Sequence, residues 1–288
     1  MRLFGFEITV HSSWLIAFGV IVWALSRDAG PLGDLPMSGS QRVLVAILSG
    51  ALLFGSVLVH ELAHAALARR QGIPVRGISL FILGGATRLE GDPKTPLASA
   101  SIAAVGPLAS LVLGGLFYSA AQLQGPSPPL GAAFAYLAVA NLLIAVFNAI
   151  PAYPLDGGHL FKAGVWAVCG SERQATLISA TAGRVFGLGI IVFGLFAMLT
   201  AGLGGVWLVL IGWFMHEAAA AGASRAATSL ALQGREAADV AARLPIVRAD
   251  STVEEARHAL LASGHDALPV VLGERCVGVV SAEGLSPA

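Results

Sequence analysis

The chain has 288 residues, of which 56% are hydrophobic and 12% are charged, and its 17 Lys and Arg residues balance 17 Asp and Glu residues. Because soluble domains carry about 25% charged residues, this composition indicates a membrane protein. A zero formal net charge without clustered Lys and Arg gives no reason to expect nucleic acid as a partner. The two cysteines, Cys169 and Cys276, are far apart and indicate neither a disulfide framework nor a thiolate zinc site.

Apolar runs are the main feature of the first 223 residues. Crossing a hydrocarbon core of about 30 Å takes roughly 20 mostly apolar residues, so runs of about that length predict membrane helices. The first run lacks the charged leader and cleavage site of a signal peptide, so we expect a retained helix. The predicted fold class is an α-helical polytopic membrane protein with about six transmembrane helices, at residues 10–25, 43–68, 97–123, 130–150, 185–200 and 205–221.

The segment after the second run, IPVRGISLFILGGATRLEGDPKTP, differs from its neighbours. Its apolar stretch of about ten residues is too short for a crossing helix. Alternating β-type residues around Gly84 and Gly85 predict a strand pair or a re-entrant element instead. An exposed edge strand within residues 75–90 is expected to be able to pair with an extended peptide segment.

Basic residues indicate how the chain crosses the membrane. Cytoplasmic loops are enriched in Lys and Arg. The segments on one side of the six predicted helices hold Arg2, Arg69, Arg70, Arg76, Arg88, Lys94, Lys162 and Arg173, whereas those on the other side hold Arg27 and Arg42. We therefore expect a multi-pass protein of the cell membrane with both termini in the cytoplasm.

The composition changes near residue 224, where Asp, Glu and Arg become frequent. We expect a membrane domain at 1–223, a linker at 224–238 and a small soluble domain at 239–288. VEEARHALLASG has helical periodicity, while LPVVL and CVGVVS are β-rich, which predicts a βαββ order. About 50 residues make a small core, so we expect this domain to pair with a second copy or to pack on the membrane domain.

The sequence HELAH lies inside the second apolar run and matches the H-E-x-x-H pattern. Residues four apart share one face of a helix, so His60 and His64 can aim at one cation with Glu61 beside them as a base. Zinc suits two imidazoles and a carboxylate, with a fourth position open to water. The alternative is a pair of structural histidines. That alternative is weakened because charged groups at the centre of a membrane helix cost about 2.5–3.5 kcal/mol each.

A third ligand is expected in NAIPAYPLDGG, residues 148–158. Its two prolines stop a regular helix and its glycines permit unusual backbone, so Asp156 is expected on an irregular segment at the end of the fourth helix. Irregular backbone at membrane depth is tolerated where it is buried in protein or lines a wet cavity. The alternative for Asp156 is an ordinary loop residue after a proline.

HELAH, NAIPAYPLDGG and GPLAS, residues 106–110, together resemble the site-2 protease family of intramembrane zinc metalloproteases, peptidase family M50. The resemblance implies one zinc ion held by His60, His64 and Asp156, with Glu61 activating water. The implied reaction is hydrolysis of peptide bonds in transmembrane or membrane-associated proteins, as in regulated intramembrane proteolysis. The resemblance also implies that Asn148 lies near the site and helps to hold the substrate backbone.

The C-terminal domain resembles a single CBS motif, as in family members similar to the sporulation proteases. CBS motifs normally work in tandem pairs that bind adenine nucleotides in a shared cleft. A single motif leaves open whether this domain pairs with a second copy to form a homodimer, senses a nucleotide, or is only structural.

Two alternative functions are a membrane transporter and an inactive scaffold. A membrane metal-ion transporter could bind a passing cation at His60, His64 and Asp156, but no further chain of carboxylates and histidines marks a path across the outer half of the membrane. The second alternative is a catalytically inactive scaffold whose C-terminal domain binds a partner, and the intact HELAH and DGG sequences argue against it.

Overall fold

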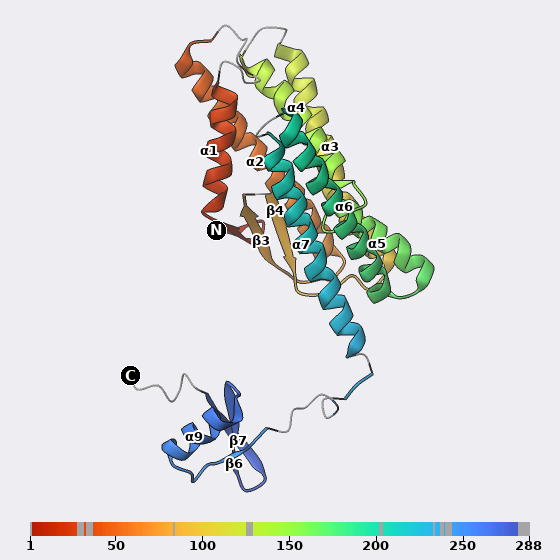
Figure 1. The fold of residues 1–288 in the computed structure, drawn as a ribbon. Helices are drawn as coiled ribbons and strands as arrows, with labels where there is room; N and C mark the ends of the chain where they lie inside the picture. The colour runs from red at the N-terminus through yellow and green to blue at the C-terminus, as the bar shows by residue number, and fades with distance from the viewer. Residues whose placement is uncertain are drawn as a thin grey trace. The chain divides into compact units, whose positions relative to one another are not determined.

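The computed structural model describes residues 2–27, 32, 37–82, 84–124, 129–201, 204–232, 234–236, 239 and 244–281. They form two compact units, Met1–Ala231 and Leu232–Ala288 (Figure 1). Within the predicted linker, 224–238, residues 224–231 are helical, and residues 233, 237 and 238 lie outside the described residues. In the predicted C-terminal domain, residues 240–243 and 282–288 also lie outside them.

Each of the six apolar runs contributes to a helix, which confirms the predicted fold class. Five of these helices are long and apolar enough to cross a membrane, whereas α1 has 14 residues and is shorter than a crossing requires. At about 1.5 Å per residue, α1 spans roughly 21 Å. The helices are α1 (Ser13–Ser26), α2 (Gly39–Arg70), α3 (Pro96–Gln124), α4 (Pro129–Asn148), α6 (Glu172–Ala201) and α7 (Gly204–Ala231).

A further helix, α5 (Asp156–Cys169), follows α4 after a short irregular segment. This helix was not predicted, because the prolines and glycines of residues 151–158 indicate only a break. α5 ends at Gly170, whose positive φ of 71° suits glycine.

Helix α2 has clear start and stop signals. At its N-terminus Ser38 and Gln41 form a capping box, in which each side chain bonds the main-chain N–H of the other residue. At its other end the chain turns at Gly72, where φ is +78°. The 32 residues between carry HELAH in their C-terminal half.

A four-stranded sheet packs against that half of α2. Its order is β1 (Arg2–Leu3), β2 (Phe6–Val10), β3 (Val75–Phe81) and β4 (Gly84–Leu89). β2 pairs with β3 in parallel, and β3 pairs with β4 antiparallel, which confirms the predicted strand pair. The strand β2 was not predicted, since Val10 was assigned to the first helix. Among the described residues, β4 has a neighbouring strand on one side only and is an edge of the sheet.

Apolar contacts fix the sheet on α2. Phe6, Ile78 and Leu80 form a buried cluster with Ala65 of α2. Arg69, near the end of α2, donates a hydrogen bond to the carbonyl of Phe4 and lies over the Phe6 ring at 4.2 Å. The turn of α2 that carries HELAH is therefore held close to the sheet.

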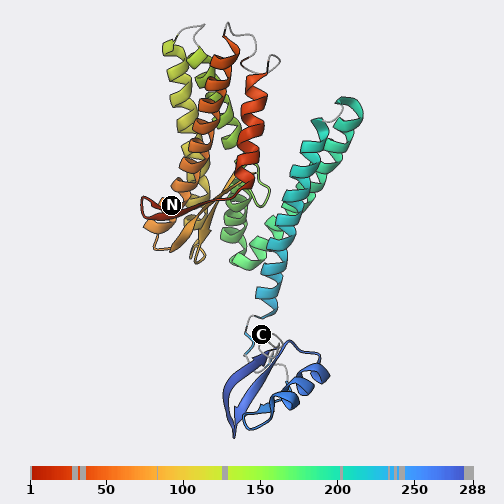
Figure 2. The same cartoon turned by 90° about the vertical axis from the view of Figure 1, so that its left-hand side faces the viewer.

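Helices α6 and α7 lie side by side along their length (Figure 2). Glycines permit this close approach: a Cβ atom added at Gly212 would lie 2.7 Å from the carbonyl oxygen of Gly187. Small residues at helix contacts are typical of membrane helix pairs. The pair meets the segment before α5 through Tyr153, which contacts Gly183 of α6 and Gly222 of α7.

The second unit has the predicted βαββ order. It contains β5 (Val247–Arg248), α9 (Val253–Ser263), β6 (Ala267–Leu272) and β7 (Arg275–Ser281), with β5 parallel and β7 antiparallel to β6. Its core consists of Val247, Ala256, Leu260 and Leu268.

Candidate metal centre

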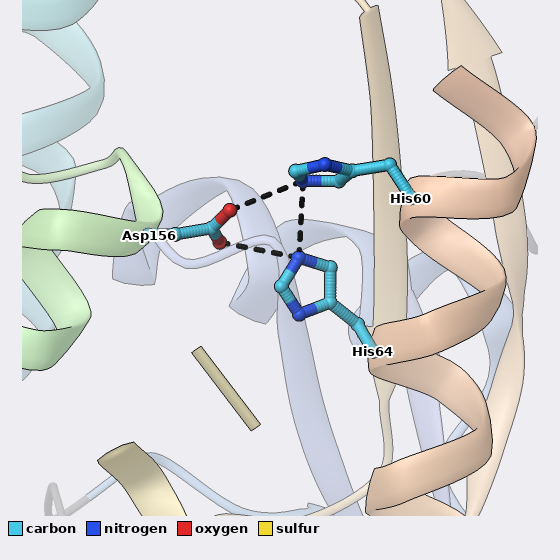
Figure 3. Close-up of side chains that lie close together, drawn as sticks. All are labelled: His60, His64 and Asp156. Carbon is cyan, nitrogen blue, oxygen red and sulfur yellow. Dashed lines mark hydrogen bonds and ion pairs between the residues drawn. The ribbon is translucent and has the colours of Figure 1, made fainter. Parts of the chain in front are cut away.

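Three predicted ligand residues come together from two separate helices (Figure 3). His60 and His64 lie one turn apart on α2, and Asp156 is the first residue of α5. The Nε2 atoms of the two histidines are 3.2 Å apart. Nε2 of His60 is 3.1 Å from Oδ2 of Asp156, and Nε2 of His64 is 3.3 Å from Oδ1. One ligand atom from each residue thus converges on a common point.

The position of Asp156 differs from the prediction in one respect. It was expected on an irregular segment at the end of the fourth helix, but the irregular segment covers residues 149–155 and Asp156 already belongs to α5. The two following glycines make this turn fit: a Cβ atom at Gly157 would collide with the carbonyl oxygen of Ala149, and one at Gly158 with the backbone of Tyr153. The carboxylate therefore lies at a helix N-terminus, where the helix dipole favours negative charge.

Helix α3 covers the other side of the two histidines. Nδ1 of His64 is 2.7 Å from the carbonyl oxygen of Ile102, and Nδ1 of His60 is 2.9 Å from Oγ of Ser110. Gly106 lies against both rings, since a Cβ atom there would be 2.6 Å from Nε2 of His60 and closer still to Nε2 of His64. Both rings are buried.

The donor set fits a zinc ion. A carbonyl oxygen only accepts, so Nδ1 of His64 carries a proton and, in the neutral ring, Nε2 presents a lone pair. That lone pair faces Nε2 of His60 and the carboxylate of Asp156, an arrangement of acceptors that a cation would stabilise. Zinc bonds of about 2.0–2.2 Å in a tetrahedron place ligand atoms roughly 3.4 Å apart. The separation of 3.2 Å between the two Nε2 atoms is close to that value, as are the 3.1 and 3.3 Å from His60 and His64 to the two different oxygens of the Asp156 carboxylate.

Glu61 is buried beside the cluster without belonging to it. The hydroxyl of Thr87 on β4 is 2.7 Å from Oε2 of Glu61 and donates to it. Gly85, on the same side of β4, leaves just enough room for the glutamate side chain. Sequence reasoning did not single out Thr87, because only the fold brings β4 against α2.

Asn148 is the last residue of α4 and precedes the irregular segment. Its side-chain amide donates a hydrogen bond to the carbonyl oxygen of Ile144, at 2.9 Å, within its own helix. It is half-buried and lies outside the three-residue cluster.

The fold and the cluster define a helical membrane protein whose site holds two buried histidines and a half-buried aspartate. Two matches to peptidase family M50 cover residues 49–134 and 127–193, and a match to the CBS domain covers residues 237–286. The chain belongs to peptidase family M50.

Individual proteins agree with this membership. A Mycobacterium tuberculosis protein that carries the name zinc metalloprotease Rip3 is 39% identical over 254 residues, which are 85% of this chain and 63% of that protein. A Synechocystis protein named as a zinc metalloprotease is 35% identical, over 88% of this chain and 67% of its own length. This chain thus spans somewhat less than two thirds of the mycobacterial relative.

A solved structure has a similar fold. The site-2 protease of Methanocaldococcus jannaschii matches with a TM-score of 0.56 and 27% sequence identity, over 77% of this chain and 93% of the archaeal chain. The second unit, Leu232–Ala288, is about a fifth of the chain, so most of the matched 77% lies in the helical unit.

Proposed function

We propose that this chain is an intramembrane zinc metalloendopeptidase that hydrolyses peptide bonds of transmembrane or membrane-associated proteins. The observation that carries the proposal is the convergence of His60, His64 and Asp156, with Glu61 alongside, in a unit with five helices long and apolar enough to cross a membrane among its described residues. Membership in peptidase family M50 and the zinc metalloproteases among the relatives support it.

Each site residue has a distinct chemical role in this proposal. His60, His64 and Asp156 would hold one zinc ion, which when bound polarises a carbonyl group and lowers the pKa of a water to about 7. Glu61 takes a proton from the attacking water and later delivers it to the leaving amine. The Thr87 hydroxyl holds one oxygen of the Glu61 carboxylate and leaves the other for this transfer.

The edge strand β4 is suited to bind the substrate. A helix hides its peptide groups in its own hydrogen bonds, so a scissile segment must first become extended. β4 lies over Glu61 through Gly85 and Thr87, and one of its edges has no neighbouring strand among the described residues. We place the extended substrate along this edge, with Asn148 as a further contact to its backbone.

The transporter alternative finds no support. Among the described residues, His60, His64 and Asp156 are the single group of three or more ligand side chains that could hold a metal ion. A transport path needs successive polar sites across the membrane.

For the membrane topology, we propose a cell-membrane protein with both termini in the cytoplasm. Within the first unit, α1 begins beside the sheet, and α7 runs toward that same end of the helices and past the level of the sheet (Figure 1). The basic residues Arg69, Arg70 and Arg76 also belong to this end. Their position agrees with the excess of positive charge on cytoplasmic segments.

For the second unit, we propose that it pairs with a second copy to form a homodimer and that the paired motifs take up an adenine nucleotide. The unit is small, and it exposes apolar side chains that a partner would cover: Ile246, Val253, Leu261, Leu272, Val277 and Val279. A partner that covers these side chains would remove their apolar surface from water, which favours association.

The first prediction concerns the base. Glu61→Gln keeps the shape of the side chain but cannot take a proton, so proteolysis should fall by about 100-fold or more while zinc stays bound. Comparing membrane-protein fragments in cells that carry the wild type or the variant should reveal uncut substrates in the variant. Cleavage of such a substrate by the purified variant at the wild-type rate would refute the role of Glu61.

The second prediction concerns the ligands. Asp156→Ala removes one of three proposed ligand groups and should abolish stoichiometric zinc binding, measured as metal content of the purified protein. The control is Asp250→Ala, which removes an exposed carboxylate paired with Arg248 in the second unit. Zinc flux through wild-type protein in proteoliposomes, without any peptide cleavage, would favour the transporter.

The third prediction concerns the edge strand. In a Glu61→Gln background with Cys169 and Cys276 replaced by Ser, Ala86→Cys on β4 should form a disulfide with cysteines placed near the scissile bond of a substrate found in the cell comparison. Arg76→Cys is the control, since Arg76 is exposed but lies on the inner strand β3. Equal cross-linking at both positions would rule out selective docking on β4.

The fourth prediction concerns the second unit. Cys276 is exposed on β7, so a membrane-impermeant maleimide should label it only after cells are permeabilised.

The purified protein should have the mass of two chains in detergent and should bind AMP or ATP. Labelling in intact cells contradicts the topology, and a monomer at all concentrations contradicts the pairing.

A further inference from the structure

GPLAS contributes two residues to the surface that covers the histidines. On α3, Ile102, Gly106 and Ser110 are spaced four apart and so share one face of the helix. His60 and His64 have the same spacing on α2. The carbonyl of Ile102 meets His64, Ser110 meets His60, and Gly106 lies against both rings. Each histidine on α2 thus faces its own acceptor on α3, with Gly106 between the two contacts.

We infer that this face of α3 selects the ring tautomer through which both histidines bind metal, and that Ser110 is the positioning residue for His60. The inference rests on the proposed zinc site. A histidine that binds a metal through Nε2 must carry its proton on Nδ1, and that N–H needs an acceptor. α3 provides an acceptor for each ring.

The two acceptors differ in chemistry. The carbonyl oxygen of Ile102 can only accept, so it holds His64 in the tautomer with Nδ1 protonated. The hydroxyl of Ser110 can accept from Nδ1 of His60 or donate to it. Ser110 therefore favours the Nδ1-protonated tautomer of His60 only when its hydroxyl oxygen accepts from Nδ1. A side-chain substitution at Ser110 removes this acceptor, whereas the main-chain acceptor of His64 cannot be removed in this way.

Burial makes this contact matter. Ser110 is fully buried, and His60 is also buried, so water cannot replace the hydroxyl as a partner for Nδ1. Without Ser110, the ring would either leave its Nδ1 proton unpaired, which costs about 1–3 kcal/mol, or move the proton to Nε2. The second choice gives a hydrogen bond to Asp156, 3.1 Å away, and blocks the lone pair that the metal needs.

The test is the zinc affinity of the purified full chain, measured by competition with a chelator. Ser110→Ala should weaken zinc binding by about 10–100-fold, the range seen when a partner of a metal-binding histidine is removed. Ser110→Thr, which keeps the hydroxyl, should restore most of the affinity. The control is Ser49→Ala: Ser49 is equally buried on α2, and its hydroxyl has no hydrogen-bond partner among the described residues.

The outcomes separate this inference from the proposed function. A wild-type protein that binds no zinc overturns the proposed function. A wild type that binds zinc, with Ser110→Ala within about twofold of it, overturns the role of Ser110 alone. Equal losses in Ser110→Ala and Ser49→Ala also overturn it, since they indicate a general packing effect. At saturating zinc, the KM for substrate should stay unchanged in Ser110→Ala, because the hydrogen bond that the variant loses is the one to the ring of His60.

Discussion

The structure depends on holding two imidazole nitrogens and a carboxylate within 3.3 Å of one another in a protein built largely of apolar helices. These groups are costly to bury, and their lone pairs repel unless a cation or a proton lies among them. The free energy that keeps them together comes from elsewhere: from the packing of α2 on the sheet and on α3, and from the turn that begins α5. The site is a polar arrangement imposed by apolar packing.

Glycine has a specific part in that packing. Gly106 lets α3 approach the histidine rings, and Gly85 lets β4 approach Glu61. A methyl group at Gly106 would occupy space that the histidine rings now fill, and one at Gly85 would occupy space that the Glu61 side chain fills. Because interiors are packed without spare volume, the neighbours could not move aside without cost. These two glycines therefore set the distances on which metal binding and proton transfer depend.

Much of this could be predicted from the sequence, and the successes share a cause. The spacing of HELAH and the length of the apolar runs are local features, and local geometry converts them directly into a helix face and a membrane helix. Asp156 was found because prolines and glycines mark an irregular backbone next to it. Ser110 and Thr87 were not assigned roles, because their importance arises from contacts with residues 50 and 26 positions away. The helix α5 was missed because the prolines and glycines before and at its start indicated only a break, and the strand β2 because it is short and depends on its pairing with β3, far along the chain.

The ligands are divided between two parts of the helical unit, and this division has a mechanical consequence. His60 and His64 belong to α2, which the sheet and α3 hold firmly. Asp156 follows a segment whose Tyr153 packs against Gly183 of α6 and Gly222 of α7. The third ligand is thus positioned by a different set of helices from the first two. Since zinc needs all three at bond distances that vary by only a few tenths of an ångström, the metal itself would couple the α6 and α7 pair to α2.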